Sequence, residues 1–212
     1  MSVAAAVGEL CRPDSCQTHR MGASRIRWLR ASFGPKADKG AALDLLVDCE
    51  DLPGDGWRKV DQRTWRTGEG GFNGDWARRA RDLGSITGWR SFHSKPTGRW
   101  AWVQVVPLAS RDDALDALAV MPGAMLANLR FEGEVRETFD GEGPPVTGAS
   151  ATWSSRSVIG LDGVATDNAI LAAVFDTWLV VANLSAPASP HNWDVVHEVI
   201  ALQSARLVRT LT

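Results

Sequence analysis

Apolar residues along this 212-residue chain recur at two spacings: every second residue, as in strands, and every three to four residues, as in helices. In the first half, turns rich in Gly and Pro separate five such segments. They are a helix over 37–49, a strand over 57–66, a helix over 74–83, and a hairpin with strands over 86–93 and 99–108. In the last strand, Trp100, Trp102 and Val106 share one face while Val103 and Val105 share the other, so we expect it to be buried on both sides.

One helix follows this hairpin and another closes the chain. Ser110 caps the first of them, which we expect to end at Pro122-Gly123. Strands are then predicted over 129–139, with a bulge at Gly133, and over 152–159, 169–175 and 178–184. The closing helix begins at Ser189-Pro190. Two hairpin-then-helix units predict an α+β fold, in which an antiparallel β-sheet has helices packed on one face.

The composition is that of a globular protein, with 44% hydrophobic and 23% charged residues. Residues 1–36 show no sustained apolar period and contain several Gly and Pro residues, which predicts a flexible N-terminal lead-in. The remaining residues, 37–212, are long enough to bury a full core, and we expect them to form a single α+β domain.

We expect neither export nor membrane insertion. The apolar run Val3–Val7 is interrupted by Gly8 and Glu9 before it reaches the length of a signal peptide. The longest apolar run, Ala169–Leu184, is shorter than a bilayer requires and contains Asp176, which favours a buried strand pair over a membrane span. Three cysteines are too few for a disulfide framework. These features predict a cytoplasmic location.

Charge and aromatic residues are concentrated in residues 57–102. This segment holds six of the ten tryptophans and eight arginines and two lysines against four acidic residues, a net charge of +6 in a chain whose total is −2. Aromatic rings interleaved with guanidinium groups suit single-stranded nucleic acid, because bases stack on the rings and arginine neutralises phosphates. Alternatively the tryptophans are core residues, since Trp76 lies on the apolar stripe of a helix and Trp100 shares a strand face with Trp102.

Two groups of residues have side chains that bind metals. They are Cys11, Cys16 and His19 with a distant Cys49, and His191, Asp194, His197 and Glu198. The first group has ligands that suit zinc but loose spacing, and the second lies at a helix start, where acidic residues are stabilising in their own right. No H-E-x-x-H motif is present, so we predict no metal site and no cofactor.

The sequence contains no recognisable catalytic motif. There is no phosphate-binding glycine loop, nucleophile elbow, CxxC pair or dinucleotide fingerprint, so we assign no catalytic residue. An enzyme is therefore the least supported class of function. A pocket that holds His93 or His197 next to a carboxylate would favour it.

Four short segments carry a family resemblance. They are Leu45-Leu46, Asp51-Leu52-Pro53 with Gly56-Trp57, the strand Val180-Val181 that ends in Asn183, and the closing helix from Val195-Val196 to Ala205-Arg206-Leu207. In these segments the chain resembles actinobacterial sensor-type and lipoprotein-type α+β domains over roughly residues 40–210. The resemblance implies a ligand-binding module without catalytic residues, of a kind that is usually exported.

The prediction that follows is a non-catalytic binding module for a small amphipathic or anionic ligand or for a partner protein. The residues expected to line its apolar cleft are Trp57, Trp65, Trp89 and Trp100, with Arg58, Arg66 and Arg90 as anion contacts at its mouth. A nucleic-acid-binding protein that uses segment 57–102 is the alternative. The two differ in whether the arginines of this segment converge on one surface; those concerned are Arg58, Arg66, Arg78, Arg79, Arg81 and Arg90.

Overall fold

A computed structural model describes residues 39–69, 74–132, 134–142, 145–161, 164–187, 189 and 191–211. The predicted lead-in, 1–36, lies outside these residues. The helices are α2 (Lys39–Asp44), α3 (Asp75–Asp82), α4 (Arg111–Glu132) and α5 (Asn192–Leu211), with a short 3-10 helix, η1 (Cys49–Asp51). The strands are β1 (Trp57–Arg66), β2 (Ile86–Ser94), β3 (Arg99–Pro107), β4 (Glu134–Glu142), β5 (Ala151–Leu161), β6 (Val164–Phe175) and β7 (Trp178–Pro187).

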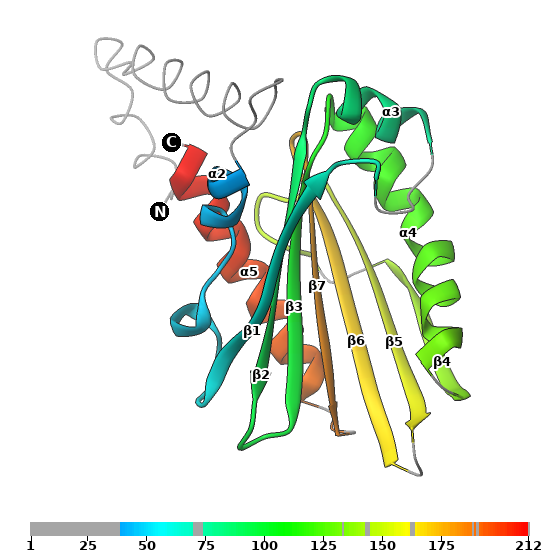
Figure 1. Ribbon diagram of the computed structural model, residues 1–212. Helices are drawn as coiled ribbons and strands as arrows, with labels where there is room; N and C mark the ends of the chain where they lie inside the picture. Colours follow the sequence, from blue (N-terminus) through cyan, green and yellow to red (C-terminus); the bar gives the residue numbers. More distant parts are fainter. Residues whose placement is uncertain are drawn as a thin grey trace, which may run out of the picture.

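All seven strands form one antiparallel sheet in the order β1-β2-β3-β7-β6-β5-β4 (Figure 1). The chain runs inward from the edge strand β1 to β3, crosses through α4 to the opposite edge at β4, and returns as a meander to β7. The two halves therefore meet in the middle, where β3 pairs with β7. The α+β fold and the two hairpin-then-helix units predicted from the sequence are confirmed.

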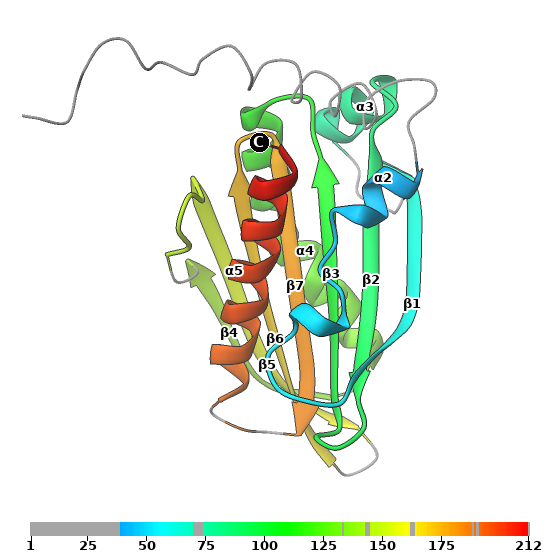
Figure 2. The same cartoon turned by 90° about the vertical axis from the view of Figure 1, so that its left-hand side faces the viewer.

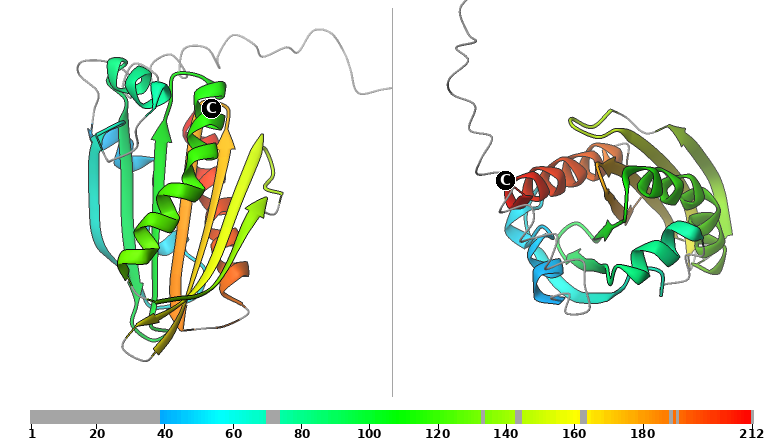
Figure 3. Two further views of the ribbon diagram at one scale, coloured as in Figure 1. Left: turned by 90° about the vertical axis from the view of Figure 1, so that its right-hand side faces the viewer. Right: turned by 90° about the horizontal axis from the view of Figure 1, so that it is seen from above.

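Helices cover both faces of the sheet, whereas the sequence prediction placed them on one. On the first face, the α5 face, α5 packs on β6 and β7 and α2 packs on β1 and β2 (Figure 2). On the second, the α4 face, α4 packs on β5, β6 and β7, and α3 packs on α4 (Figure 3). The reason is the nearly continuous apolar run Ala169–Leu184, most of which is buried, because such a run needs cover on both sides. Asp176 lies in the turn within this run, with a φ of 52°.

Two helix ends differ from the prediction. Helix α4 continues through Pro122 to Glu132 and takes in the first residues of the predicted strand 129–139. Proline removes one backbone hydrogen bond but the residues that follow include good helix formers such as Ala124, Met125 and Leu126. The strand predicted there starts at Glu134, and its register shift lies between Val135 and Glu137. The predicted bulge residue, Gly133, lies outside the described residues.

The first helix ends at Asp44 because the next three residues leave it to enter the core. Leu45, Leu46 and Val47 are almost fully buried. Gln203 of α5, also fully buried, replaces their helical hydrogen bonds: its Nε2 donates to the Leu45 carbonyl at 2.7 Å and its Oε1 accepts from the Val47 amide at 2.9 Å. One glutamine thus joins this segment to the closing helix.

This arrangement makes a testable prediction about Gln203. Replacing it by leucine leaves a buried amide and a buried carbonyl without partners, so we expect Gln203→Leu to lower the free energy of unfolding by about 2 kcal/mol. Urea denaturation followed by tryptophan fluorescence measures this. The exposed Ala205→Ser on the same helix is the control, with an expected change within about 0.5 kcal/mol. Equal stability of the two variants would contradict the structural role of Gln203.

Candidate functional site

Four tryptophans of three neighbouring strands point to the α4 face. Trp65 of β1 is paired with Thr87 of β2, and both line a pocket beneath α4. Because every second residue of a strand shares a face, Trp89 lies on the same side as Thr87. Trp100 and Trp102 of β3 likewise lie on the side of Gln104, which lines that pocket. We call the surface formed by Trp65, Trp89, Trp100, Trp102 and His93 the aromatic face.

Cross-strand pairs extend this surface in regular rows. Trp100 is opposite His93, and their rings stack with centroids 4.3 Å apart and planes 24° from parallel. Trp89 is opposite both Gln104 and Arg63, whose guanidinium carbon lies 5.9 Å from the indole centroid. Each row therefore combines an aromatic ring with polar neighbours.

The helices leave much of the aromatic face open. Since α4 packs on β5, β6 and β7 and α3 packs on α4, their cover of β1–β3 is restricted to the end near Trp65. Along the strands away from that end, Trp89 and Trp102 are half-buried and Trp100 is 48% exposed. The prediction that Trp100 points to the interior is wrong, because nearly half of this side chain is exposed on the aromatic face.

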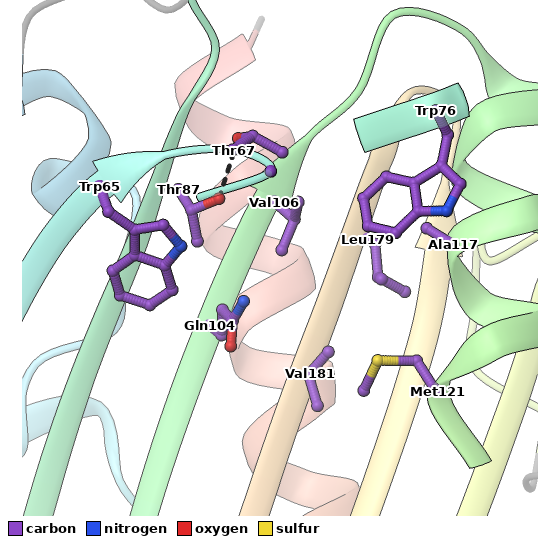
Figure 4. Close-up of a pocket in the computed structure, with 11 residues that line it drawn as sticks. Trp65, Thr67, Trp76, Thr87, Gln104, Val106, Ala117, Met121, Leu179 and Val181 are labelled. Carbon is purple, nitrogen blue, oxygen red and sulfur yellow. Dashed lines mark hydrogen bonds between the residues drawn. The ribbon is translucent and has the colours of Figure 1, made fainter. Parts of the chain in front are cut away.

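A small pocket lies at the covered end (Figure 4). Trp76 of α3 and Met121 of α4 face Gln104, Val106 and Val181 of the sheet there. The enclosed volume is about 20 Å³, which is room for about one water molecule. The hydroxyls of Thr67 and Thr87 at its wall bond each other at 2.9 Å. A methyl-sized group fits this pocket, while a larger ligand has to lie along the open surface beside it.

The structure brings together part of the predicted ligand set and separates the rest. Trp65, Trp89 and Trp100 lie on the aromatic face, and Arg58, paired with His93, lies at its outer edge. The other three predicted residues belong to the α5 face. Trp57 is in the core there, with its Nε1 donating to the Pro53 carbonyl at 2.9 Å, Arg66 is exposed at the end of β1, and Arg90 is buried.

Arg90 holds the segment that follows α2. It is 6% exposed, and its guanidinium donates to the carbonyls of Val47 at 2.8 Å, Leu43 at 3.2 Å and Leu46 at 3.3 Å. It also contacts the side chains of Gln62 and Asp48 at 3.2 and 3.3 Å. With its donors directed at these groups, Arg90 has a structural role in this conformation.

Sequence reasoning missed four residues of this site: Trp102, His93, Arg63 and Gln104. Trp102 was counted as core because it shares a strand face with Val106, which is buried. The signal that would have found them is the pairing of β2 with β3, which places Trp102 opposite Ser91, between the His93–Trp100 and Trp89–Gln104 pairs. Such a register needs the position of the turn as well as the apolar pattern.

The six arginines in question do not converge on one surface. Arg58 and Arg66 lie on opposite faces and Arg90 is buried. The other three belong to α3, where Arg78 pairs with Asp75 at 2.9 Å and the Nε of Arg79 donates to Asp113 of α4 at 2.8 Å. A continuous phosphate-binding stripe, as nucleic acid needs, is not formed by these residues.

The predicted metal and catalytic candidates are not assembled in the described part of the chain. No three His, Cys, Asp or Glu side chains are grouped there for a metal. Burial, and then the neighbouring Asp48, raise the pKa of the Cys49 thiol, so it stays protonated. Cys11, Cys16 and His19 lie outside the described residues. Exposed His191 and Asp194 are 3.8 Å apart.

A histidine next to a carboxylate in a pocket would favour an enzyme, and the described residues do not place His93 or His197 in this way. His93 stacks on Trp100, and the strand residue opposite it on β1 is an arginine. His197 lines a groove of about 450 Å³ between α5 and residues 145–147, and no carboxylate is among the lining residues.

Within the residues that the structure describes, no helix is both long and apolar enough to cross a membrane.

Comparisons with known proteins find similarity in structure alone. The sequence matches no protein family and no curated protein. The extracellular domain of PknH from Mycobacterium tuberculosis is similar with a TM-score of 0.48 and 8% identity, over 82% of this chain and 96% of that one. An uncharacterised protein from Mycobacterium smegmatis, the Rv0999 ortholog, has a TM-score of 0.40 and 10% identity, over 87% and 95%.

Both structures come from mycobacteria. The first is an extracellular domain by description, whereas the cytoplasmic location expected for this chain stays a prediction.

Proposed function

We propose that this protein is a non-catalytic binding module whose ligand lies on the aromatic face. One observation carries the proposal: four tryptophans of β1, β2 and β3 point the same way, on a part of the sheet that the helices leave open. Contiguous aromatic surface of this kind is costly to expose to water, and it is typical of ligand and partner sites. Tryptophan also contributes a large contact area for little loss of side-chain freedom.

The surroundings of the rings favour an amphipathic ligand. An apolar end fits against Trp102 and Trp89, with a methyl-sized tip in the pocket beside Trp65. At the outer edge, Arg58 is exposed, and Arg63 pairs with Asp61 at 2.6 Å. The edge therefore offers hydrogen-bond donors in addition to the apolar rings, and Arg58 is a cation there without an acidic partner in the described part of the chain. An extended segment of a partner protein has the same combination of groups.

Tryptophan indole signals provide the test. In a 15N-labelled protein each indole N–H gives one NMR peak, and a screen of small amphipathic compounds should produce ligands that shift the peaks of Trp89, Trp100 and Trp102. We expect Trp102→Ala to weaken such a ligand by about tenfold, because one stacked ring contributes about 1–3 kcal/mol.

Trp193→Ala is the matched control, since Trp193 is half-buried on α5 at the other face. It should leave the affinity unchanged. Ligands that shift the peaks of Trp193 or Trp178 and leave those of the aromatic face in place would show that the binding site lies elsewhere.

A further inference from the structure

The chemistry of the ligand can be inferred from how polar groups flank the aromatic face. The rows of paired residues run from β1 through β2 and β3 to β7. All rings of the aromatic face except Trp65 of β1 lie on the two middle strands, β2 and β3. On the β7 side Trp100 is opposite Ser185, which is half-buried, and Trp102 is opposite Asn183, which is buried. The Ser185 hydroxyl donates to the side-chain oxygen of Asn168 at 2.8 Å, and the Asn183 amide donates to the same oxygen at 2.5 Å. On the β1 side the groups are Arg58, Asp61 and Arg63. Hydroxyl, amide and mutually paired charged groups thus border the rings on both sides.

The indole ring of Trp100 is stacked on one side and exposed to solvent on the other. His93 covers one face of the Trp100 indole by stacking at 4.3 Å, so the 48% of Trp100 that is exposed belongs to its other face and its edge. That other face is turned toward the β7 side, where Ser185 follows in the same row. Trp102 is the next residue on this side of β3, about 6.8 Å along the strand. The two rings offer a stepped platform, and beside it the half-buried Ser185 hydroxyl, whose proton goes to Asn168, keeps acceptor capacity.

A second observation is the side chain of Gln104. It is half-buried in the pocket lining between Trp65 and Val181, and no hydrogen bond of its amide occurs within the described part of the chain. An apolar ligand that covered this amide would leave it without water or a partner, which is costly. The amide therefore favours a ligand that brings its own hydroxyl or carbonyl groups.

We propose that the ligand of this face is a neutral oligosaccharide. A pyranose ring has an apolar face of C–H groups that stacks on indole, and a rim of hydroxyls that needs donors and acceptors at its sides. Around the rings, Arg58 is a donor, the Gln104 amide is a donor and an acceptor, and the Ser185 hydroxyl is an acceptor. Because Arg63 pairs with Asp61, Arg58 is the cation of this border that has no acidic partner among the described residues. One such cation is too little charge for a phosphate backbone. This inference rests on the proposed function, because it names the ligand class of the same site.

The experiment is an NMR titration of the 15N-indole peaks with five probes from three classes of ligand. Cellohexaose, maltohexaose and mannohexaose represent neutral saccharides, octyl sulfate represents anionic amphiphiles, and a thymidine oligonucleotide represents nucleic acid. We expect the hexasaccharides to shift the peaks of Trp100 and Trp102 with dissociation constants on the order of millimolar, equally at low and high salt. Stacking platforms tolerate different rings, so more than one hexasaccharide should bind.

Two variants identify the contacts. Trp100→Ala should weaken the hexasaccharides about tenfold, and folding is not at risk because the side chain is half exposed. Gln104→Met keeps the size of the side chain but removes its hydrogen bonds, so it should weaken the hexasaccharides about fivefold and leave octyl sulfate unchanged or tighter. Trp193→Ala again serves as the control.

The outcomes separate the two proposals. If octyl sulfate shifts the aromatic-face peaks, loses affinity in Trp100→Ala, and no hexasaccharide binds, the saccharide inference is wrong and the binding module stands. Salt-dependent binding of the oligonucleotide that requires Trp100, without saccharide binding, overturns the inference in favour of nucleic acid. If none of the probes shifts these peaks, the saccharide inference fails, and an unsuccessful wider screen removes the proposed function as well.

Discussion

Replacing Arg90 by leucine is expected to lower the free energy of unfolding by about 3–4 kcal/mol. The guanidinium of Arg90 donates to three backbone carbonyls, that of Leu43 in α2 and those of Leu46 and Val47 directly after α2. Leucine fills part of the space but leaves the carbonyls of Leu46 and Val47 buried without this donor, at about 1–3 kcal/mol for each one that water cannot reach. The Leu43 carbonyl keeps the Leu46 amide as a donor at 3.1 Å. Urea denaturation followed by tryptophan fluorescence gives the measurement.

The control is Arg66→Leu, because Arg66 is an exposed arginine of the neighbouring strand β1. Its effect on stability should stay within about 0.5 kcal/mol. The sequence predicted both arginines as anion contacts of the ligand, so the pair separates the two roles. An Arg90→Leu protein with normal stability and weakened ligand binding would restore the sequence-based prediction.

The same variant has a signature in pH. A hydrogen bond from the Cys49 amide lowers the pKa of Asp48, burial opposes this, and Arg90 lowers it further. A carboxylate with a folded-state pKa below its unfolded value adds stability above the unfolded pKa and loses it as the pH falls through the folded pKa. The part of this pH-dependent stabilisation that comes from Arg90 is absent from the Arg90→Leu variant. The difference in the free energy of unfolding between wild type and Arg90→Leu should therefore narrow as the pH falls from the unfolded-state pKa of Asp48 through its lower folded-state pKa.

Most strands were predictable because alternation is a local signal. β1, β2 and β3 agree with their predicted ranges to within one residue, and the run Ala169–Leu184 forms the buried pair β6–β7. The end of α4 was not predictable in this way. Pro122-Gly123 is a strong stop signal in sequence, yet packing of α4 on β5, β6 and β7 holds the helix through it. Tertiary contacts outweighed a local preference at that point.

The candidate site depends on information that is not local. Alternation places Trp89 and Trp100 on some face of their strands, but strand pairing decides that both share the face of Trp65. Whether that face is open depends on where α4 crosses the sheet, and this is set by residues far along the chain. The same limit explains Arg90, since its partners at positions 43, 46 and 47 are brought to it by the entry of that segment into the core.

The removal of Asp167 should be at least as destabilising as that of Arg90. Asp167 is fully buried on the α5 face, where Arg156 of β5 donates to it with Nε at 2.8 Å and Nη2 at 2.5 Å. Asn192 at the start of α5 donates to it at 3.2 Å and also to the Pro187 carbonyl at 3.1 Å. The carboxylate thus joins β5, β6 and the first turn of the closing helix.

We expect Asp167→Ala to cost about 3–5 kcal/mol, because it leaves the guanidinium of Arg156 partly buried without its counter-charge. Removing both partners in Arg156→Met/Asp167→Leu should recover part of this loss, since two apolar side chains need no pairing. The exposed Asp194→Asn in the first turn of α5 is the control and should change stability by less than about 1 kcal/mol.

Denaturation gives the free energies of unfolding of these variants, and amide hydrogen exchange should show faster opening at the start of α5. A double variant less stable than the single one would contradict a pairwise role. Because this cluster lies on the opposite face from the tryptophans, indole peaks of the aromatic face that stay in place would show that stability and binding belong to separate sides of the sheet.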